Sequence, residues 1–155
     1  MSHSASTIRI EPTKTEGDLM QVLAIQEVVF IEEQGMSMEL ESEILDREAL
    51  YMLAYQQGHA VGTGRLLVLK EPPLGERGRW GQLARMAVLR SSRGAGIGKA
   101  LLSILLEEAK KRGLEGLSLQ APVSAQSFYE KEGFVVSSEV FYEARMPHVE
   151  MRRSF

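Results

Sequence analysis

The chain has 155 residues, 44% of them hydrophobic and 25% charged, which is typical of one globular domain and excludes disorder, collagen and coiled coil as descriptions of the whole chain. It contains no cysteine, which excludes disulfides, cysteine nucleophiles, thiolate zinc sites and iron–sulfur clusters, and its three histidines leave little material for a metal site. The formal net charge of −3 argues against nucleic acid as the main partner.

Hydrophobic periodicity and turn residues predict strands and helices that alternate along the chain. In chain order they are a strand at 8–10, a helix from 15 to a stop at Gly35, a short acidic helix within 36–48, strands at 50–55, 59–70 and 83–89, a helix at 99–112, a strand at 117–121, a helix at 124–132, and strands at 134–136, 139–142 and from 149 onward. Thr15 begins the first helix with a pattern like a capping box, Gln57-Gly58 is a hairpin turn, and residues 71–81 predict an exposed loop. This order indicates a mixed-sheet domain of the α/β or α+β class.

The most informative segment is Arg93-Gly94-Ala95-Gly96-Ile97-Gly98-Lys99, between a predicted strand and the strongest predicted helix. Its glycines allow the backbone to approach a ligand closely, and the N–H groups at the helix start favour an anion, so the segment has the chemistry of a phosphate site. A Walker A loop fails at Arg93 and Ala100, and a dinucleotide fingerprint fails at Lys99. The residues Arg93, Gly96 and Gly98 instead match the spacing Arg-x-x-Gly-x-Gly. A glycine-assisted turn without a ligand is the alternative.

Two motifs resemble those of the GCN5-related N-acetyltransferase (GNAT) family. Leu-Ala-Arg-Met-Ala-Val-Leu (83–89) followed by Arg-Gly-Ala-Gly-Ile-Gly-Lys-Ala-Leu-Leu (93–102) is similar to the strand, loop and helix that hold the coenzyme A pyrophosphate in the family. Ser-Phe-Tyr-Glu-Lys-Glu-Gly-Phe (127–134) is similar to a later helix ending. The chain further resembles the ElaA-like branch of the family at residues 29–34, 61–66 and 146–151. The resemblance extends over about residues 7–151.

The resemblance implies a single GNAT domain over residues 1–155, with its core at about 7–151. Its expected fold is a mixed central sheet of about six to seven strands flanked by about four helices. The strand at 83–89 is expected to splay from the strand at 117–121 and leave a slot for the cofactor. Pro122 departs from the family pattern, because it has no backbone N–H with which to contact the pantetheine arm or the acceptor.

The resemblance also implies an activity: acetyl-coenzyme A-dependent transfer of an acetyl group directly to an amine of a small molecule or protein, without a metal. The main chain is expected to hold the pantetheine arm and the pyrophosphate. The implied cofactor-binding residues are Met86, Ala87, Val88, Arg93, Gly94, Ala95, Gly96, Ile97, Gly98 and Lys99. A GNAT-like module that binds or senses acyl-coenzyme A without catalysis is the alternative. A nucleoside triphosphate hydrolase would need the Walker residues that are missing.

Three side chains are candidates for proton transfer. By the resemblance, Tyr129 is the general acid that protonates the departing thiolate, and the alternative is an ordinary residue at the edge of the core. The base for the amine is expected at Glu33, which ends the first helix, or at His148; the alternative for each is a hydrogen-bonded surface residue. A backbone N–H near Val88 is expected to polarise the thioester carbonyl, as an oxyanion hole does.

The amine acceptor is expected to contact the variable segments 33–48 and 71–81. The first of these carries an acidic run, which either attracts a cationic amine or is a solvated helix face. An exposed final strand would permit a homodimer. No apolar run is longer than Ala49–Tyr55, and the first residues lack a signal-peptide pattern, so we expect no membrane association and a cytoplasmic protein.

Overall fold

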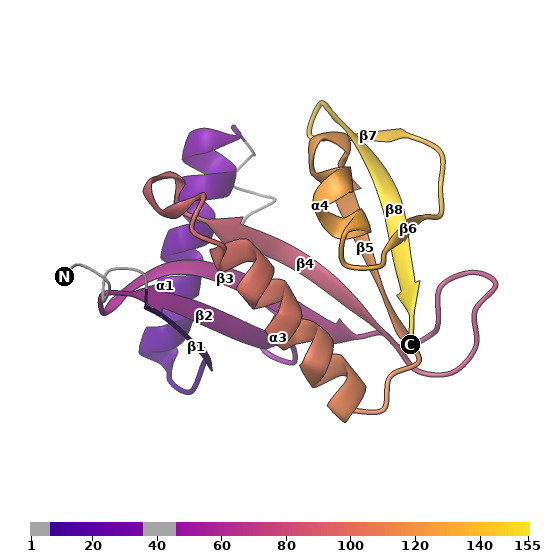
Figure 1. The fold of residues 1–155 in the computed structure, drawn as a ribbon, viewed down its shortest axis with the longest axis horizontal. Coiled ribbons are helices and arrows are strands. Elements are labelled where there is room, and N and C mark those ends of the chain that lie inside the picture. The colour runs from indigo at the N-terminus through magenta and orange to yellow at the C-terminus, as the bar shows by residue number, and fades with distance from the viewer. Residues whose placement is uncertain (1–6, 36–45) are drawn as a thin grey trace. The chain divides into compact units, whose positions relative to one another are not determined.

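The computed structural model describes residues 7–35 and 46–155 (Figure 1). The chain forms two compact units. The first unit contains the described residues up to Leu66 together with 85–107, and the second contains 67–84 and 108–155. The short acidic helix predicted within 36–48 falls mainly on 36–45, outside the described residues. Among the helices of the described chain, none is both long enough and apolar enough to cross a membrane.

The first unit is a sheet with helices packed on it. In chain order its elements are β1 (Ile8–Pro12), α1 (Glu16–Gln26), the π-helix η2 (Glu27–Glu33), β2 (Leu50–Gln56), β3 (His59–Val68), the end of β4 (Trp80–Val88), the 3₁₀ turn η3 (Arg90–Ser92) and the first part of α3 (Ile97–Lys111). β1, β2 and β3 are antiparallel neighbours, and β4 follows β3 in the sheet. The predicted turn joins β2 to β3 with positive φ at Gln57 (53°) and Gly58 (81°), as tight hairpins require.

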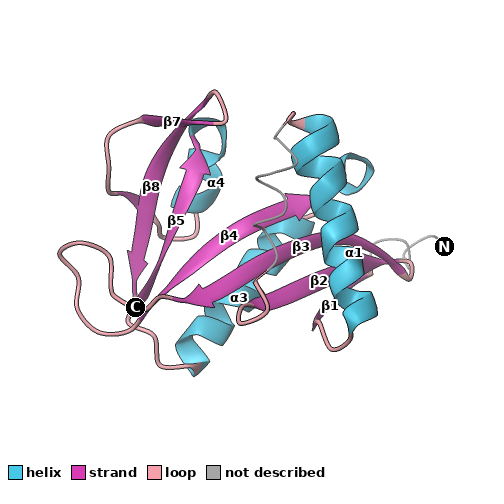
Figure 2. Cartoon of the chain, turned by 180° about the vertical axis from the view of Figure 1, so that it is seen from behind, coloured by secondary structure: helices cyan, strands magenta, loops and turns pink. Residues whose placement is uncertain are grey.

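Helices cover both faces of this sheet (Figure 2). Thr15 caps α1 in a capping box, since its hydroxyl accepts the Asp18 N–H and the Asp18 carboxylate accepts the Thr15 N–H. The helices α1 and η2 bury their apolar face in a cluster formed by Val22, Ile25, Val29, Phe30, Tyr51, Leu53 and Ala87. On the opposite face α3 approaches β3 closely, because a Cβ on Gly64 would lie 2.5 Å from Sδ of Met86 and 2.9 Å from Cδ1 of Leu105.

The second unit is centred on β5. Its elements are the start of β4, the end of α3, β5 (Gly116–Pro122), the 3₁₀ turn η4 (Val123–Ala125), α4 (Gln126–Glu130), β6 (Val135–Val136), β7 (Phe141–Glu143) and β8 (Met146–Ser154). β5 is parallel to β4 and antiparallel to β8, and the short strands β6 and β7 pair with β8. The pairs between β4 and β5 stop at Gln82 and Ser118, although β4 continues to Val88 and β5 to Pro122. The expected splay requires the pairing to stop in this way.

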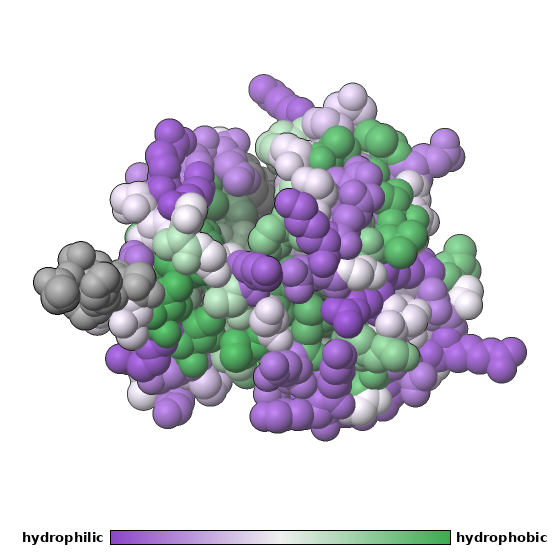
Figure 3. Space-filling model, in the orientation of Figure 1, coloured by the Kyte–Doolittle hydropathy of each residue, from purple (hydrophilic) through white to green (hydrophobic). Residues whose placement is uncertain are grey.

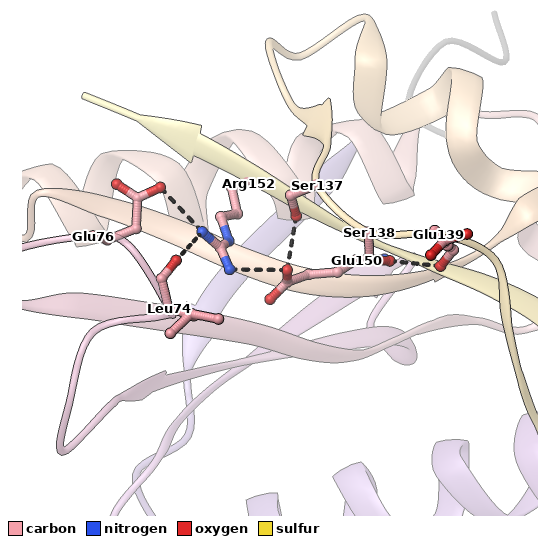
Figure 4. A network of polar contacts seen from close by, with 7 residues as sticks. All are labelled: Leu74, Glu76, Ser137, Ser138, Glu139, Glu150 and Arg152. Atoms are coloured by element: carbon pink, nitrogen blue, oxygen red, sulfur yellow. Dashed lines mark hydrogen bonds and ion pairs between the residues drawn. The ribbon is translucent and has the colours of Figure 1, made fainter.

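Arg152 in β8 fixes the loop that precedes β4 (Figure 4). Its Nη1 donates to the Leu74 carbonyl at 2.8 Å and lies 3.2 Å from the Glu76 carboxylate, while its Nη2 lies 3.1 Å from Glu150. The Ser137 hydroxyl donates to the same Glu150 oxygen at 2.8 Å. The loop predicted at 71–81 is therefore held by a polar network, with the Leu74 side chain left 93% exposed.

The predicted fold class is confirmed, with eight strands and three α-helices in the described chain where about six to seven strands and four helices were expected. Several boundaries differ from those predicted; β8, for example, begins at Met146 instead of 149. β4 begins at Trp80 instead of 83 because the Trp80 ring is buried and its Nε1 donates to the Arg77 carbonyl. The first helix changes from α to π at Glu27. The helix predicted at 124–132 is divided into η4 and α4, and it closes early because Gly133, with φ of 90°, lets the Phe134 N–H bond back to Tyr129.

Candidate functional site

A glycine turn leads into α3 and leaves backbone N–H groups free at the start of the helix. Gly94 and Gly96 have φ of 87° and 81°, a left-handed conformation that other residues rarely adopt, while a Cβ on either would meet nothing within 4 Å. The glycines are therefore required by the positive φ of the backbone at these positions, and not by a lack of room for a side chain. The hydrogen bond that opens the helix runs from the Ala100 N–H to the Gly96 carbonyl at 3.0 Å. The N–H groups of the first turn have no partner within the helix.

The charges around this turn favour an anion. The first turn of α3 carries no acidic side chain and contains Lys99, and the helix dipole adds positive charge at the same end. The turn is firmly anchored, because Ile97 is 1% exposed and Leu101, one helical turn further, is fully buried. The segment predicted to hold the pyrophosphate thus has the geometry of a preformed anion cradle, made of main-chain groups on a rigid helix start.

The end of β4 presents a main-chain N–H on its open side. Arg85 has φ of 57° inside the strand, as in a β-bulge, so Met86 to Val88 follow a local irregularity. The Leu89 N–H donates to the Val61 carbonyl in β3 at 2.8 Å. Because successive residues of a strand direct their N–H groups to opposite sides, the Val88 N–H points away from β3. The side chains of Met86 and Ala87 pack into the two faces of the first unit.

The Arg93 side chain is bound by protein groups. Its Nη1 and Nη2 donate to the two oxygens of Glu33 at 2.6 and 2.8 Å, and its Nε donates to the Val88 carbonyl at 2.9 Å. Nη2 of Arg90 lies 3.3 Å from the same carboxylate. The hydrogen bonds from Arg93 lower the pKa of Glu33, and they raise the pKa of Arg93 in return. Two predicted site residues that are 60 positions apart are therefore in direct contact.

Tyr129 lies on α4, in the second unit. The residue is 9% exposed, and its ring stands edge-on to Phe128 and Phe134 at centroid distances of 5.0 and 5.9 Å. Burial raises the pKa of its hydroxyl to about 12. The hydroxyl forms no hydrogen bond with any residue that the structure describes. The phenol is thus held by aromatic packing, stays protonated at neutral pH, and keeps its hydrogen available for another group.

His148 lies near the start of β8, paired in register with Pro122 of β5. Its Nδ1 is 2.9 Å from the Met146 carbonyl, and its ring stacks on Phe141 at 5.9 Å. Since a carbonyl only accepts, Nδ1 is the donor, and a neutral ring carries its lone pair on Nε2. Pro122 keeps its place in the β5–β8 register without an N–H. In the described ranges 7–35 and 46–155, no three His, Asp or Glu side chains are grouped so as to hold a metal.

The predicted site residues are distributed over both units. Glu33, Met86 to Val88 and the glycine turn belong to the first, and Tyr129 and His148 to the second. The contact that the sequence analysis missed is the double hydrogen bond between Glu33 and Arg93, for which neither segment contains a local signal. The roles assigned to these residues stay predictions.

Comparison with known proteins identifies the family. Residues 19–155 match the family model described as an acetyltransferase (GNAT) domain. YyaT of Bacillus subtilis is 34% identical over 149 residues, which are 94% of this chain and 95% of YyaT. An acyl-CoA N-acyltransferase from Pseudomonas aeruginosa is 25% identical with a TM-score of 0.79, over 96% of this chain and 100% of that one. Escherichia coli ElaA has the same fold, with a TM-score of 0.81 at 24% identity over 96% and 100% of the two chains. The chain belongs to the GNAT family of N-acetyltransferases.

Proposed function

We propose that the protein transfers an acetyl group from acetyl-coenzyme A directly to the amine of a small molecule or protein. The observation that carries the proposal is the preformed anion cradle of Gly94 to Lys99 at the start of α3, which fits a diphosphate. Two named neighbours support the choice of coenzyme A. One is the acyl-CoA N-acyltransferase from Pseudomonas aeruginosa, and the other is the NatC complex bound to Gag peptide and CoA, which shares the fold at a TM-score of 0.73 and 17% identity.

The main chain would hold the cofactor. The N–H groups of the glycine turn would bind its pyrophosphate, and the open side of β4 would pair with its pantetheine arm through Met86, Ala87 and Val88. The Val88 N–H, which points away from β3, would donate to the carbonyl oxygen of the thioester and stabilise the negative charge that develops there. The bound cofactor supplies an acetyl group activated as a thioester. No acyl-enzyme is required, in agreement with the absence of cysteine.

Two side chains of the second unit would move the protons. His148 would accept a proton from the attacking amine on Nε2, because its Nδ1 donates to the Met146 carbonyl. The Tyr129 hydroxyl, which is protonated at neutral pH, would give its proton to the sulfur as the carbon–sulfur bond breaks. The new amide then leaves with the acetyl group, and the thiol of coenzyme A is released. The proton held by His148 passes to solvent and Tyr129 regains one from solvent, so both side chains return to their starting states.

Two measurements on the full chain test this function. Coenzyme A at 100 times its Kd should stabilise the protein by about 2.7 kcal/mol, seen as a higher Tm, and ATP should not. Acetyl-coenzyme A mixed with a panel of amines should release free thiol. A chain that binds coenzyme A but releases no thiol with any amine would support the non-catalytic acyl-CoA-binding module instead. Stabilisation by ATP and not by coenzyme A would refute both.

A further inference from the structure

The guanidinium of Arg93 connects three segments of the first unit: the end of η2, the end of β4 and the glycine turn before α3. Its two terminal nitrogens bind the Glu33 carboxylate at 2.6 and 2.8 Å, and its Nε binds the Val88 carbonyl at 2.9 Å. A double hydrogen bond of this kind fixes both the position and the plane of the guanidinium. Because Arg93 directly precedes Gly94, a fixed side chain constrains the beginning of the turn.

The same contacts limit the chemistry of Glu33. Its side chain is 18% exposed, and both carboxylate oxygens accept hydrogen bonds from Arg93. Glu33 faces inward because it lies one helical turn beyond the buried residues Val29 and Phe30. A carboxylate that is bound by an arginine keeps its charge and is a poor proton acceptor. The adjacent Glu32, in contrast, is exposed and forms no ion pair in the described chain.

We propose that Glu33 is a positioning residue, which acts through Arg93 to fix the glycine turn and the Val88 carbonyl before the cofactor binds. In this role Arg93 is a structural support of the turn, and the diphosphate is bound by main-chain N–H groups. A turn that is ordered in advance loses less conformational entropy when the ligand binds, so affinity rises. This inference rests on the proposed function for the identity of the ligand, coenzyme A.

The three roles that Glu33 could have predict different results for coenzyme A binding. If Glu33 acted only through its negative charge, neutralising it beside an anion site would strengthen binding. If it were the general base, its replacement would lower kcat and leave the affinity for coenzyme A unchanged. If it positions the turn, its replacement weakens binding although a negative charge has been removed.

The substitution that separates these roles is Glu33→Gln, which removes the charge and keeps the size. Glu32→Gln is the matched control, with the same chemical change at the neighbouring exposed position. By calorimetry on the full chain, we expect the Kd for coenzyme A to rise about tenfold in Glu33→Gln and to stay unchanged in Glu32→Gln. Tighter or unchanged binding in Glu33→Gln overturns the inference.

Amide hydrogen exchange tests the same proposal without any ligand. Residues 94–98 should exchange faster in Glu33→Gln than in the wild type, whereas α1 should keep its exchange rates and so show that the fold is intact. Unchanged exchange in the turn overturns the proposal. If the wild type does not bind coenzyme A at all, the proposed function fails while this measurement still decides the role of Glu33.

A second substitution tests whether Glu33 acts through Arg93. Arg93→Lys keeps the positive charge but cannot form the double hydrogen bond. If Glu33 acts only through its bond to Arg93, the effects of the two substitutions should not add. The double variant Glu33→Gln/Arg93→Lys should then bind coenzyme A no more weakly than the single variant with the lower affinity. Effects that multiply in the double variant would show that the residues act separately and would overturn the proposal.

Discussion

The Tyr129 hydroxyl combines a fixed protonation state with weak acidity. Burial raises its pKa to about 12, so the phenol remains protonated at neutral pH. Complete transfer of its proton to a thiolate whose conjugate thiol has a pKa of about 8.5 would be uphill by about 5 kcal/mol. We therefore expect the proton to move only as the carbon–sulfur bond breaks, when the sulfur carries a developing negative charge in a site of low polarity.

Replacing Tyr129 by Phe removes the hydroxyl and retains the ring that packs on Phe128 and Phe134. We expect kcat to fall about 100-fold while the Kd for coenzyme A stays unchanged. In the wild type, ionisation of Tyr129 should cause no loss of rate below a pH of about 11, because its pKa is about 12. A variant with full turnover, or a wild-type rate that falls near pH 10 in a Tyr129-dependent way, would contradict the assignment.

The proposed base is tested by a pair of identical substitutions at two histidines. His148→Gln removes the free Nε2, and we expect kcat to fall about 100-fold with unchanged affinity for coenzyme A. His59→Gln is the control, because His59 is exposed at the hairpin turn between β2 and β3. Steady-state rates of thiol release measure both. Equal rates for the two variants would exclude His148 as the base.

Glycines in regular elements differ in what a side chain would meet. A Cβ on Gly116 in β5 would lie 2.5 Å from the Arg153 carbonyl and 2.5 Å from the Trp80 ring, neither of which can move easily. A Cβ on Gly17 in α1 would meet only the Thr15 hydroxyl, at 3.6 Å. We expect Gly116→Ala to lower the free energy of unfolding by about 3 kcal/mol and Gly17→Ala to raise it by about 0.5 kcal/mol. Urea unfolding measures both, and a neutral Gly116→Ala would show that β5 and β8 can separate locally.

Elements with local chemical signals were predictable from the sequence. The capping box of Thr15 and the turn at Gln57-Gly58 depend on a few adjacent residues, and both form as expected. The change to a π-helix at Glu27 has no such local signal. Its hydrogen bond from the Gln34 N–H to the Val29 carbonyl occurs in a segment whose side chains Val29 and Phe30 are packed in the core. That packing depends on residues far away in the sequence. The early start of β4 likewise depends on the burial of Trp80. The sequence did not predict it, because the glycines and prolines before Trp80 are typical of an exposed loop.

The features of the candidate site fall into the same two groups: those with a local sequence signal and those formed only by the fold of the whole chain. The glycine turn was visible in the sequence because positive φ at Gly94 and Gly96 is a local requirement that only certain residues meet. The bond between Glu33 and Arg93 was not visible, because 60 positions separate the partners and only the fold brings the end of η2 to the start of α3. Arg152 and the loop at Leu74, 78 positions apart, are a second example of this kind.

The pH dependence of the whole molecule's stability follows from groups whose pKa differs between the folded and unfolded chain. Arginine partners lower the pKa of Glu33 and of Glu16, which is bound by Arg47, below the usual 4.5. Their stabilisation is present above that pH and is lost as the pH falls through the lower, folded values. Burial raises the pKa of Tyr129 from 10.0 to about 12, so its contribution is complete below pH 10 and is lost as the pH rises toward 12.

We therefore expect the free energy of unfolding to be nearly flat from about pH 5 to 9 and to fall on either side of this range. In Glu33→Gln the acid-side slope should be smaller, because the folded state no longer has that low-pKa carboxylate to protonate. In Tyr129→Phe the loss between pH 10 and 12 should be smaller, and the acid side should match the wild type. Urea unfolding at a series of pH values gives both slopes. An acid-side slope in Glu33→Gln equal to that of the wild type would mean that the bond to Arg93 does not persist in solution.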